Sequence, residues 1–472
     1  MVALTKSDFR LFLEAPRHLW ARKHDLLPQE ISPFAELLIQ QGYSVEDLAQ
    51  EYLDHTVFPA NPGWRLDWQR TCEDGFFQSR ADALVHKPAN RSYDLYEIKS
   101  STKVDQEHLY DVAFQTLVLS RHFQLDHLYI LHLNKEYILT GDLDLSGLFL
   151  AEDVTERVAK LMLEVEELRQ LALQAALAEK PEGLDCCLDA NNCPCPQICH
   201  PDLPDFSIFD IPRLSKPKKK QLLDAGIRAA RDIPENFGLN PKQMVICERA
   251  RSNTELINRP ALQAELAGFE FPLYFLDYET CLVTVPRYPG YHPQQQVVFQ
   301  YSLHRLESPH GELTHFEHLS AACEEPSISL VEHLSRDLGP RGTVLTWNKT
   351  FEMGRNREMA LVSPQYAGFL DSLNQRIYDL GEIINQGYYL HPGFKGSWSI
   401  KHVLPIMVPE LGYDDLAIRK GDQASAAWWQ ICFGDIPDEE KERLKAALLT
   451  YCALDTLAMV EIYHRFCELA AG

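Results

Sequence analysis

Five of the twelve cysteines of this chain lie within one stretch of fourteen residues, CCLDANNCPCPQIC. Disulfides of a secreted protein would pair cysteines spread along the chain, whereas thiols this close together are typical of a metal or iron–sulfur site in a reducing compartment. The stretch therefore predicts a metal-bound segment in a cytoplasmic protein. Its candidate ligands are Cys186, Cys187, Cys193, Cys195 and Cys199.

Length and charge limit the possible folds and partners. The 472 residues are enough for two or three domains. No apolar run approaches the roughly 20 residues that span a bilayer, so we expect no membrane segment. Because 45 basic residues stand against 68 acidic ones, the net charge is −23. This charge argues against a fold that binds nucleic acid over a broad basic surface, and it leaves open a carboxylate-rich metal site or a narrow basic path.

The hydrophobic pattern predicts an α/β chain in three parts. Residues 1–200 alternate helix and strand patterns and end in the cysteine stretch. A proline-rich segment then opens a small helical connector, residues 201–268, and residues 269–472 are predicted to form a second α/β segment. We therefore expect two α/β domains joined by a helical connector.

The connector holds the densest basic segment of the chain, LSKPKKKQLLDAGIRAARDIP. Its pattern of helix, Gly226 turn and helix resembles a degenerate helix-hairpin-helix, a motif whose turn amides face the phosphates of a nucleic acid. A structural linker with a solvated lysine run is the alternative. The candidate nucleic-acid-binding residues are Lys216, Lys218, Lys219 and Lys220.

A first set of ionisable residues lies on two neighbouring predicted strands. Glu97 and Lys99 are two apart in the strand 93–100, so their side chains leave the same face, and Asp82 lies on the strand before it. Two converging carboxylates can hold a divalent ion beside a lysine that positions water, which are the parts needed for metal-assisted hydrolysis of phosphodiester bonds. Gln115, on the following helix, could orient the lysine or the backbone. An exposed strand edge with alternating charges is the alternative.

A second set lies in the C-terminal segment. The apolar run FPLYFLDYET ends in Asp277 and Glu279, and carboxylates at the edge of an apolar core are costly unless they bind something. Glu352 follows the predicted strand TVLTW, and Tyr451 and Asp455 lie four apart on one face of a predicted helix. Four carboxylates could hold two divalent ions, with the tyrosine hydroxyl orienting the attacking water. Taken singly, each fragment also fits a strand end or an ordinary helix surface.

The order Asp82, turn, Glu97-x-Lys99 and glutamine-bearing helix resembles the PD-(D/E)XK nuclease superfamily, in its RecB-like branch with the CRISPR adaptation nucleases. The resemblance implies a restriction-endonuclease-like fold for residues 1–200 and ligands for Mg²⁺ or Mn²⁺ at Asp82 and Glu97. Members of this branch often carry a histidine on an early helix, where this chain offers Glu46 as a further candidate ligand.

The same resemblance implies a [4Fe–4S] cluster at the cysteine stretch. The C-x5-C-x5-C spacing of these relatives is present at Cys187, Cys193 and Cys199. The relatives supply the fourth cysteine from an N-terminal segment, where this chain has Ala15 in EAPRHLW. Either Cys186 or Cys195 completes the cluster locally, or the site binds zinc or no metal.

The second set resembles the DEDD exonucleases of the ribonuclease-H-like fold, in the variant with tyrosine in the third motif. The motifs D-x-E, N-x-x-F-(D/E) and Y-x3-D match Asp277/Glu279, Asn348/Phe351/Glu352 and Tyr451/Asp455. The resemblance implies a ribonuclease-H-like fold with a mixed sheet for residues 269–472, with metal ligands at the four carboxylates. Glu352 stands where the family usually has aspartate, which shifts the carboxylate by about 1.5 Å. Segments around Asp379, and around Ser399 and Lys401, resemble the intervening motifs of the family.

Together these motifs cover nearly the whole chain and resemble an uncharacterised bacterial family that joins the two nuclease domains through a cysteine cluster. The main expectation is a Mg²⁺- or Mn²⁺-dependent nuclease with two active sites, acting on DNA from single-stranded ends. In one alternative a single site is active, the other is a substrate clamp, and RNA is the substrate. In another, the chain is a non-catalytic nucleic-acid-binding subunit with protein partners in a defence or repair complex.

Overall fold

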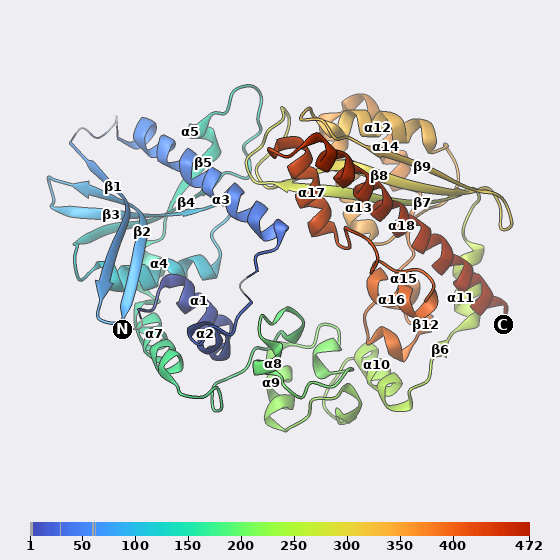
Figure 1. The fold of residues 1–472 in the computed structure, drawn as a ribbon, viewed down its shortest axis with the longest axis horizontal. Helices are drawn as coiled ribbons and strands as arrows, with labels where there is room; N and C mark the ends of the chain where they lie inside the picture. Colours follow the sequence, from blue (N-terminus) through green and yellow to red (C-terminus); the bar gives the residue numbers. More distant parts are fainter. Residues whose placement is uncertain (1–2, 29, 59–60, 62) are drawn as a thin grey trace. The chain divides into compact units, whose positions relative to one another are not determined.

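The computed structural model describes residues 3–28, 30–58, 61 and 63–472 (Figure 1). The chain divides into two compact units. Unit 1 comprises Met1–Asp202 and Val283–Gln295, and unit 2 comprises Leu203–Leu282 and Gln296–Gly472. Each unit contains a sheet with parallel and antiparallel pairs, so the expected α/β class with a mixed sheet is confirmed. The expected connector, 201–268, belongs to unit 2 apart from its first two residues.

The sheet of unit 1 has five strands in the order β1-β2-β3-β4-β5. β3 and β4 are parallel, and the other neighbouring pairs are antiparallel. The strands are β1 (Arg65–Asp74), β2 (Phe77–Lys87), β3 (Ser92–Lys99), β4 (Leu125–Leu133) and β5 (Phe149–Asp153). Asp82 therefore lies on β2 and Glu97 on β3, two strands that pair directly, as the sequence predicts.

Helices pack on both faces of this sheet. The helices of unit 1 are α1 (Lys6–Glu14), α2 (Pro16–Lys23), α3 (Pro33–Tyr52), α4 (Gln106–Leu119), α5 (Leu145–Leu148), α6 (Thr155–Ala159), α7 (Met162–Leu177) and α8 (Pro196–Cys199). Leu84 and Leu95 join the core formed with α1, α4 and α7, whereas the alternating side chains of the same strands join the core formed with α3. Asp82 and Glu97 are each two residues from these leucines and so face α1 and α4.

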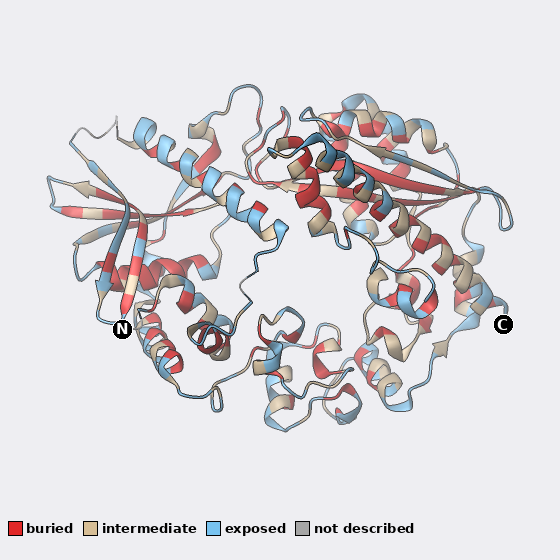
Figure 2. Cartoon of the chain, in the orientation of Figure 1, coloured by how far each residue is buried: buried red, intermediate tan, exposed pale blue. Residues whose placement is uncertain are grey.

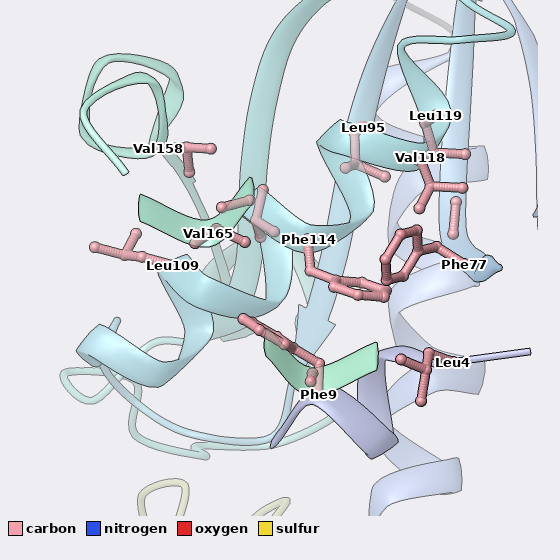
Figure 3. Close-up of a cluster of buried hydrophobic side chains, with 14 of the residues drawn as sticks. Leu4, Phe9, Phe77, Leu95, Leu109, Phe114, Val118, Leu119, Val158 and Val165 are labelled. Atoms are coloured by element: carbon pink, nitrogen blue, oxygen red, sulfur yellow. The ribbon is translucent and has the colours of Figure 1, made fainter. Parts of the chain in front are cut away.

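Three aromatic rings hold α1 and α4 against the sheet (Figure 3). The ring centroids of Phe9 and Phe114 are 5.1 Å apart, and Phe77 meets Phe114 edge-on at 6.2 Å. A capping box fixes the start of α1, because the Thr5 hydroxyl accepts from the Asp8 amide and the Asp8 carboxylate accepts from the Thr5 amide. This packing determines where side chains from the first turn of α1 meet the sheet.

One part of unit 1 comes from far along the chain. Residues 283–295 connect two strands of the second sheet, yet they pack within unit 1. The Leu139 amide donates to the Tyr291 carbonyl (2.9 Å), and the Gly290 amide donates to the Leu139 carbonyl (2.7 Å). Tyr291 is only 2% exposed. Unit 1 is therefore built from two separate segments of the sequence.

The main sheet of unit 2 has the order β11-β10-β7-β8-β9. β10 is parallel to both β7 and β11, and β8 is antiparallel to β9. A small antiparallel pair joins β6 to β12. The strands are β6 (Leu256–Ile257), β7 (Leu273–Val283), β8 (Gln295–Leu306), β9 (Leu313–Leu319), β10 (Val344–Thr346), β11 (Ile377–Asp379) and β12 (Tyr389–Leu390).

Two apolar cores of unit 2 lie on opposite faces of β7. The helices of unit 2 are α9 (Lys216–Asp224), α10 (Pro241–Ser252), α11 (Arg259–Ala267), α12 (Pro326–Asp337), α13 (Lys349–Val362), α14 (Ala367–Asn374), α15 (Glu382–Asn385), α16 (Ile400–Met407), α17 (Gly421–Phe433) and α18 (Asp438–Ala471). Phe275 packs with α16 and α18, while Tyr274 and Leu276 pack with α12, α13 and α14. Asp277 and Glu279 continue the face of Phe275 and so point toward α18.

The predicted helix–Gly226–helix pattern of the connector is only half present. α9 ends in a Schellman motif, because Gly226 has φ +75° and the Ile227 amide donates to the Leu222 carbonyl (2.9 Å). The chain that follows pairs with an earlier segment, through the Ile208 amide and the Arg228 carbonyl (2.9 Å), instead of forming a second helix. Only a 3₁₀ turn occurs next, at 230–232. The expected helix-hairpin-helix is therefore wrong for this segment, because a long-range backbone pairing occupies the residues that it needs.

α18 is long and apolar enough, by length and composition, to cross a membrane. However, 56% of its most apolar window is buried inside the protein, and Figure 2 shows buried positions along the helix. Met459, Ile462 and Phe466 pack into the core with Phe275. The helix thus has the burial of a core helix, and among the described residues no other helix passes the same test.

Candidate functional site

Four carboxylates of unit 2 converge as the motifs predict. We call Asp277, Glu279, Glu352 and Asp455 the carboxylate cluster. β7 supplies the first two, the first turn of α13 supplies the third, and α18 supplies the fourth. The last three are 6%, 2% and 8% exposed. The charges of Asp277 and Asp455 act on Glu279, and those of Asp277 and Glu279 act on Glu352, so the cluster is a single electrostatic unit.

Burial and mutual repulsion dominate the charge state of this cluster. Burial, followed by the charges of neighbouring carboxylates, raises the pKa of Asp277, Glu279 and Glu352 well above its usual range. Burial also raises the pKa of Asp455 to about 6. Glu352 Oε2 has no hydrogen-bond partner within the described part of the chain. One oxygen each of Asp277 and Glu279 lies within 4.8 Å of the other. Carboxylate oxygens at this spacing fit a divalent cation, which would hold the carboxylates in the ionised form.

A lysine and two tyrosines surround Asp455. The Tyr413 hydroxyl donates to Asp455 Oδ1 (2.5 Å), and Lys401 Nζ donates to the Tyr451 hydroxyl (3.3 Å). Lys401 also lies 5.5 Å from the centroid of each tyrosine ring. Burial, with the charge of Asp455, raises the pKa of Tyr451, so its hydroxyl stays protonated and can hold a water molecule. Sequence reasoning found Tyr451 and Lys401 but missed Tyr413, which no motif marks.

Two neighbouring residues shape the cluster without belonging to it. Cys452 Sγ lies 3.8 Å from Asp277 Oδ2, and burial raises the pKa of this thiol well above its usual range. Cys452 therefore acts as a weak hydrogen-bond donor to the carboxylate. Asp379 accepts hydrogen bonds from the Lys349 amide (3.0 Å) and the Gly381 amide (3.0 Å). It thereby holds the start of α13 and positions the turn that carries Glu352.

The first predicted set also converges, on the α1 and α4 side of the unit 1 sheet. Glu97 is 1% exposed, and Lys99 Nζ lies 2.8 Å from Glu97 Oε1. Gln115 Nε2 donates to the other oxygen of Glu97, so this side chain orients the carboxylate instead of Lys99. Asp82 Oδ2 accepts from the Ile98 amide (2.9 Å). The four residues thus form one group, which we call the E-x-K group.

Two residues outside the predicted set complete the E-x-K group. Lys6, in the first turn of α1, forms an ion pair with Glu97, and Asp111 of α4 binds Lys99 Nζ at 2.7 Å. Both were missed, because neither belongs to a local pattern with the motif. Burial, together with the charge of Glu97, raises the pKa of Glu46, so Glu46 lies close to this group.

The cations in this group balance its acids. Burial would raise the pKa of Glu97, but the charges of Lys6 and Lys99 outweigh burial and lower it. Burial, together with the charge of Glu97, raises the pKa of Asp82 to about 7. Burial would lower the pKa of Lys99, yet Glu97 and Asp111 raise it. In contrast to the carboxylate cluster, this group is compensated by the side chains of the protein.

The cysteine stretch forms a compact donor group that could hold a metal. One ligand atom from each of His18, Cys187, Cys193 and Cys199 lies within 4.8 Å of every other. The two other cysteines of the stretch are outside this group, although Cys195 Sγ lies 4.0 Å from Cys199 Sγ. The fourth donor is the histidine of EAPRHLW, three residues after Ala15. His18 is recognised as a candidate ligand only because α2 lies beside the cysteine stretch in the structure. Cys186 is half-buried beside the group.

Hydrogen bonds in the donor group reflect its close packing. Burial would lower the pKa of His18, but hydrogen bonds with Cys199, Glu14 and Cys193 raise it to about 10. A hydrogen bond from Cys187 lowers the pKa of Cys199 to about 3. A metal ion that bound these donors would displace their protons.

The predicted lysine segment lies on α9. Lys218 Nζ donates to the Gly238 carbonyl (2.5 Å), and Lys219 Nζ lies 5.3 Å from the Phe209 ring centroid. Lys220 lies 4.0 Å from Asp224, and Lys216 is exposed at the start of the helix. Nucleic-acid binding by these lysines stays a prediction.

Comparisons with known proteins match only part of the chain. Residues 274–399 match a family model described as "Domain of unknown function (DUF2779)". The chain is 30% identical over 136 residues to "Uncharacterized protein UU173" of Ureaplasma parvum serovar 3 (strain ATCC 700970), covering 25% of this chain and 20% of that protein. The chain thus spans about a fifth of the length of this curated relative. No solved structure matches the chain. The family match includes Asp277, Glu279 and Glu352 and ends before Asp455.

Proposed function

We propose that this protein is a divalent-metal-dependent nuclease whose catalytic centre is the carboxylate cluster of unit 2. One observation carries the proposal: four carboxylates from two helices and one strand lie together, three of them buried and Asp277 half-buried, with few compensating cations. Burying several carboxylates is costly, and coordination of a cation is the usual compensation. The resemblance to DEDD exonucleases of the ribonuclease-H-like fold gives the same assignment from the motifs.

Mg²⁺ or Mn²⁺ suits these donors, because both are hard cations that prefer carboxylate oxygens. Such ions, when bound, activate water and stabilise the leaving oxygen of a phosphodiester. The residues that would hold them are Asp277, Glu279, Glu352 and Asp455. Tyr451, whose hydroxyl stays protonated, would orient the attacking water. Lys401 would keep Tyr451 in place through its hydrogen bond.

The proposed substrate is DNA, which the enzyme would hydrolyse from single-stranded ends. RNA is the alternative substrate. Because the net charge of −23 repels a phosphate backbone, we expect the protein to contact the nucleic acid at local sites and not along a long duplex. Metal ions would reverse the local sign at the cluster and so admit a phosphate. Binding should consequently weaken when divalent ions are removed.

The E-x-K group of unit 1 is the proposed second metal site, in a PD-(D/E)XK-like domain. Its support is the meeting of Asp82, Glu97, Lys99 and Gln115 on paired strands and one helix. However, Lys6 already binds Glu97, so an ion must displace this lysine. While Lys6 binds Glu97, this ion pair favours the alternative in which unit 2 alone is catalytic.

The test is cleavage of labelled single- and double-stranded DNA and RNA with Mn²⁺. Asp277→Asn should lower the rate by at least about 100-fold, since even residues that only support metal ligands are worth 10- to 100-fold. Asp371→Asn is the matched control, because Asp371 is exposed on α14. Lys99→Met, assayed separately, reports on unit 1.

Two outcomes would refute the assignment. Cleavage that survives the double variant Lys99→Ala, Asp277→Ala would show that neither group is catalytic. A wild-type protein that binds these nucleic acids but cleaves none of them in Mn²⁺ would point to the non-catalytic binding subunit.

A further inference from the structure

Four side chains from two distant parts of unit 1 meet at one buried point. His18 comes from α2, and the three thiols come from the segment 187–199. His18 is 4% exposed, Cys187 is 3% exposed and Cys199 is 4% exposed. Three soft thiols and one imidazole form the Cys₃His set that structural zinc sites use.

The distances fit a single ion. Around tetrahedral zinc, with Zn–S near 2.3 Å and Zn–N near 2.0–2.1 Å, two sulfurs are about 3.8 Å apart and a sulfur and a nitrogen about 3.5 Å apart. Here Cys193 Sγ and His18 Nε2 are 3.4 Å apart, and all four donor atoms lie within 4.8 Å of one another. A four-iron cluster binds each ligand on a different iron atom, so its ligands must stand wider apart than those around one ion.

The second nitrogen of His18 provides an independent observation. His18 Nδ1 lies 3.3 Å from Glu14 Oε2, at the end of α1. Histidines that bind a metal usually donate their other N–H to a carboxylate, which fixes the ring and its tautomer. Glu14 therefore directs Nε2 toward the thiols, as a ligand atom requires.

We propose that His18, Cys187, Cys193 and Cys199 bind one Zn²⁺ in a closed structural site. This assignment replaces the iron–sulfur cluster implied by the RecB-like resemblance. Four protein ligands leave no open position, so the site supports the fold and takes no part in hydrolysis. Cys186 and Cys195 lie outside the coordination sphere. When zinc binds, the three thiols bind as thiolates and their protons go to solvent.

Neighbouring contacts show what the site would hold together. Arg17 donates to the Leu184 carbonyl (2.9 Å) and to the Ile198 carbonyl (2.9 Å), so it binds both ends of the cysteine stretch. Trp20 Nε1 donates to the Ala178 carbonyl (2.9 Å). α2 and the last segment of unit 1 are thereby joined by hydrogen bonds around the zinc ligands. The ion would anchor a segment that has little regular secondary structure of its own.

The first experiment measures metal content directly. The full chain is purified anaerobically from cells supplied with both iron and zinc, and zinc, iron and acid-labile sulfide are quantified. We expect one zinc per chain and a colourless protein. Zinc K-edge absorption should give three sulfur ligands and one nitrogen. Stoichiometric iron and sulfide with absorption near 400 nm would overturn the proposal, and so would a zinc shell of four sulfurs.

Variants then test which residues bind. Cys193→Ser should lower the zinc content at least tenfold, whereas Cys195→Ser, the matched control from the same stretch, should keep one zinc per chain. His18→Cys should also keep zinc and change the zinc ligands to four sulfurs. This variant identifies the histidine ligand even if Cys193→Ser fails to fold. Equal zinc loss in Cys195→Ser, or a wild-type shell in His18→Cys, would show that the assigned ligands are wrong.

Discussion

The Lys6 ammonium and the Lys99 ammonium both bind Glu97 Oε1, so one buried carboxylate oxygen is shared by two cations. Gln115 binds the other oxygen of the same carboxylate. Both oxygens that would coordinate a divalent ion at Glu97 are thus already bound by side chains. Lys6 is the contact that α1 adds from outside the strand motif, and it is the one that an ion would have to displace.

Replacing Lys6 should make the E-x-K group a better ion site. We expect Lys6→Met to raise Mn²⁺ affinity in unit 1 by about tenfold or more, because removing a competing positive charge near a buried carboxylate strengthens cation binding. Titration calorimetry in an Asp277→Asn background measures this site with binding in unit 2 weakened. Lys103→Met, at an exposed position, is the control. Unchanged affinity, or a gain that persists with Glu97→Gln, would contradict the expectation.

The hydroxyl of Tyr413 should tune metal binding at the carboxylate cluster. Its hydrogen bond to Asp455 orients that carboxylate. Tyr413→Phe should therefore weaken Mn²⁺ binding by about 10- to 100-fold, the usual cost of losing a group that supports a metal ligand. Binding isotherms of this variant and of Tyr366→Phe give the comparison. Identical affinities for both would exclude a supporting role for the hydroxyl.

A buried histidine in the core of unit 2 should make stability depend on pH. Burial, followed by the charge of His315, lowers the pKa of His304 to about 4. The folded protein therefore keeps His304 neutral between about pH 4 and 6.5, while the unfolded chain takes up a proton there. The stabilisation is complete above pH 6.5 and is lost as the pH falls toward 4.

The variant His304→Asn should remove this dependence while keeping a polar partner for Thr456, which His304 contacts at 2.8 Å. Between pH 7 and pH 4.5, wild-type protein should lose about 2 kcal/mol more unfolding free energy than the variant. Urea titrations at the two pH values measure it. His310→Asn, at an exposed histidine, should behave as wild type. Parallel losses in all three proteins would count against the buried neutral state.

Gly342 should be intolerant of any side chain. Its φ is +97°, and a Cβ atom would lie 2.1 Å from the Pro272 carbonyl oxygen. Gly342→Ala should therefore cost several kcal/mol, about 3 or more, because both strain and a backbone clash must be relieved. Gly354→Ala, inside α13 with open space, should be neutral or stabilising by up to about 1 kcal/mol. Thermal unfolding of the two variants gives the contrast, and equal melting temperatures would refute it.

The parts of the site that could be predicted from sequence are those fixed by local periodicity. Glu97 and Lys99 share a face because strand side chains alternate, and Tyr451 and Asp455 share a face because they are one helical turn apart. The α/β class followed from the same periods. These relationships need no knowledge of which elements pack together.

The residues that were missed depend on packing between distant elements. Lys6 and His18 each approach a partner from a helix that no local pattern connects to the site. The failed second helix of the connector has the same cause, because the Arg228 carbonyl is taken by the distant Ile208 amide. Long-range pairing thus overrode a helical pattern that was correct up to Gly226.

The excursion of residues 283–295 into unit 1 has a consequence for dissecting the protein. A fragment ending at Asp202 would leave Leu139 without the backbone partners that Tyr291 and Gly290 provide. No single cut therefore yields two complete modules, and a fragment that fails to fold would say nothing about the carboxylate cluster or the E-x-K group. The two units alternate along the sequence, because residues 283–295 of unit 1 lie between two segments of unit 2. A chimera that takes unit 1 from a relative would therefore also have to take this short segment from that relative.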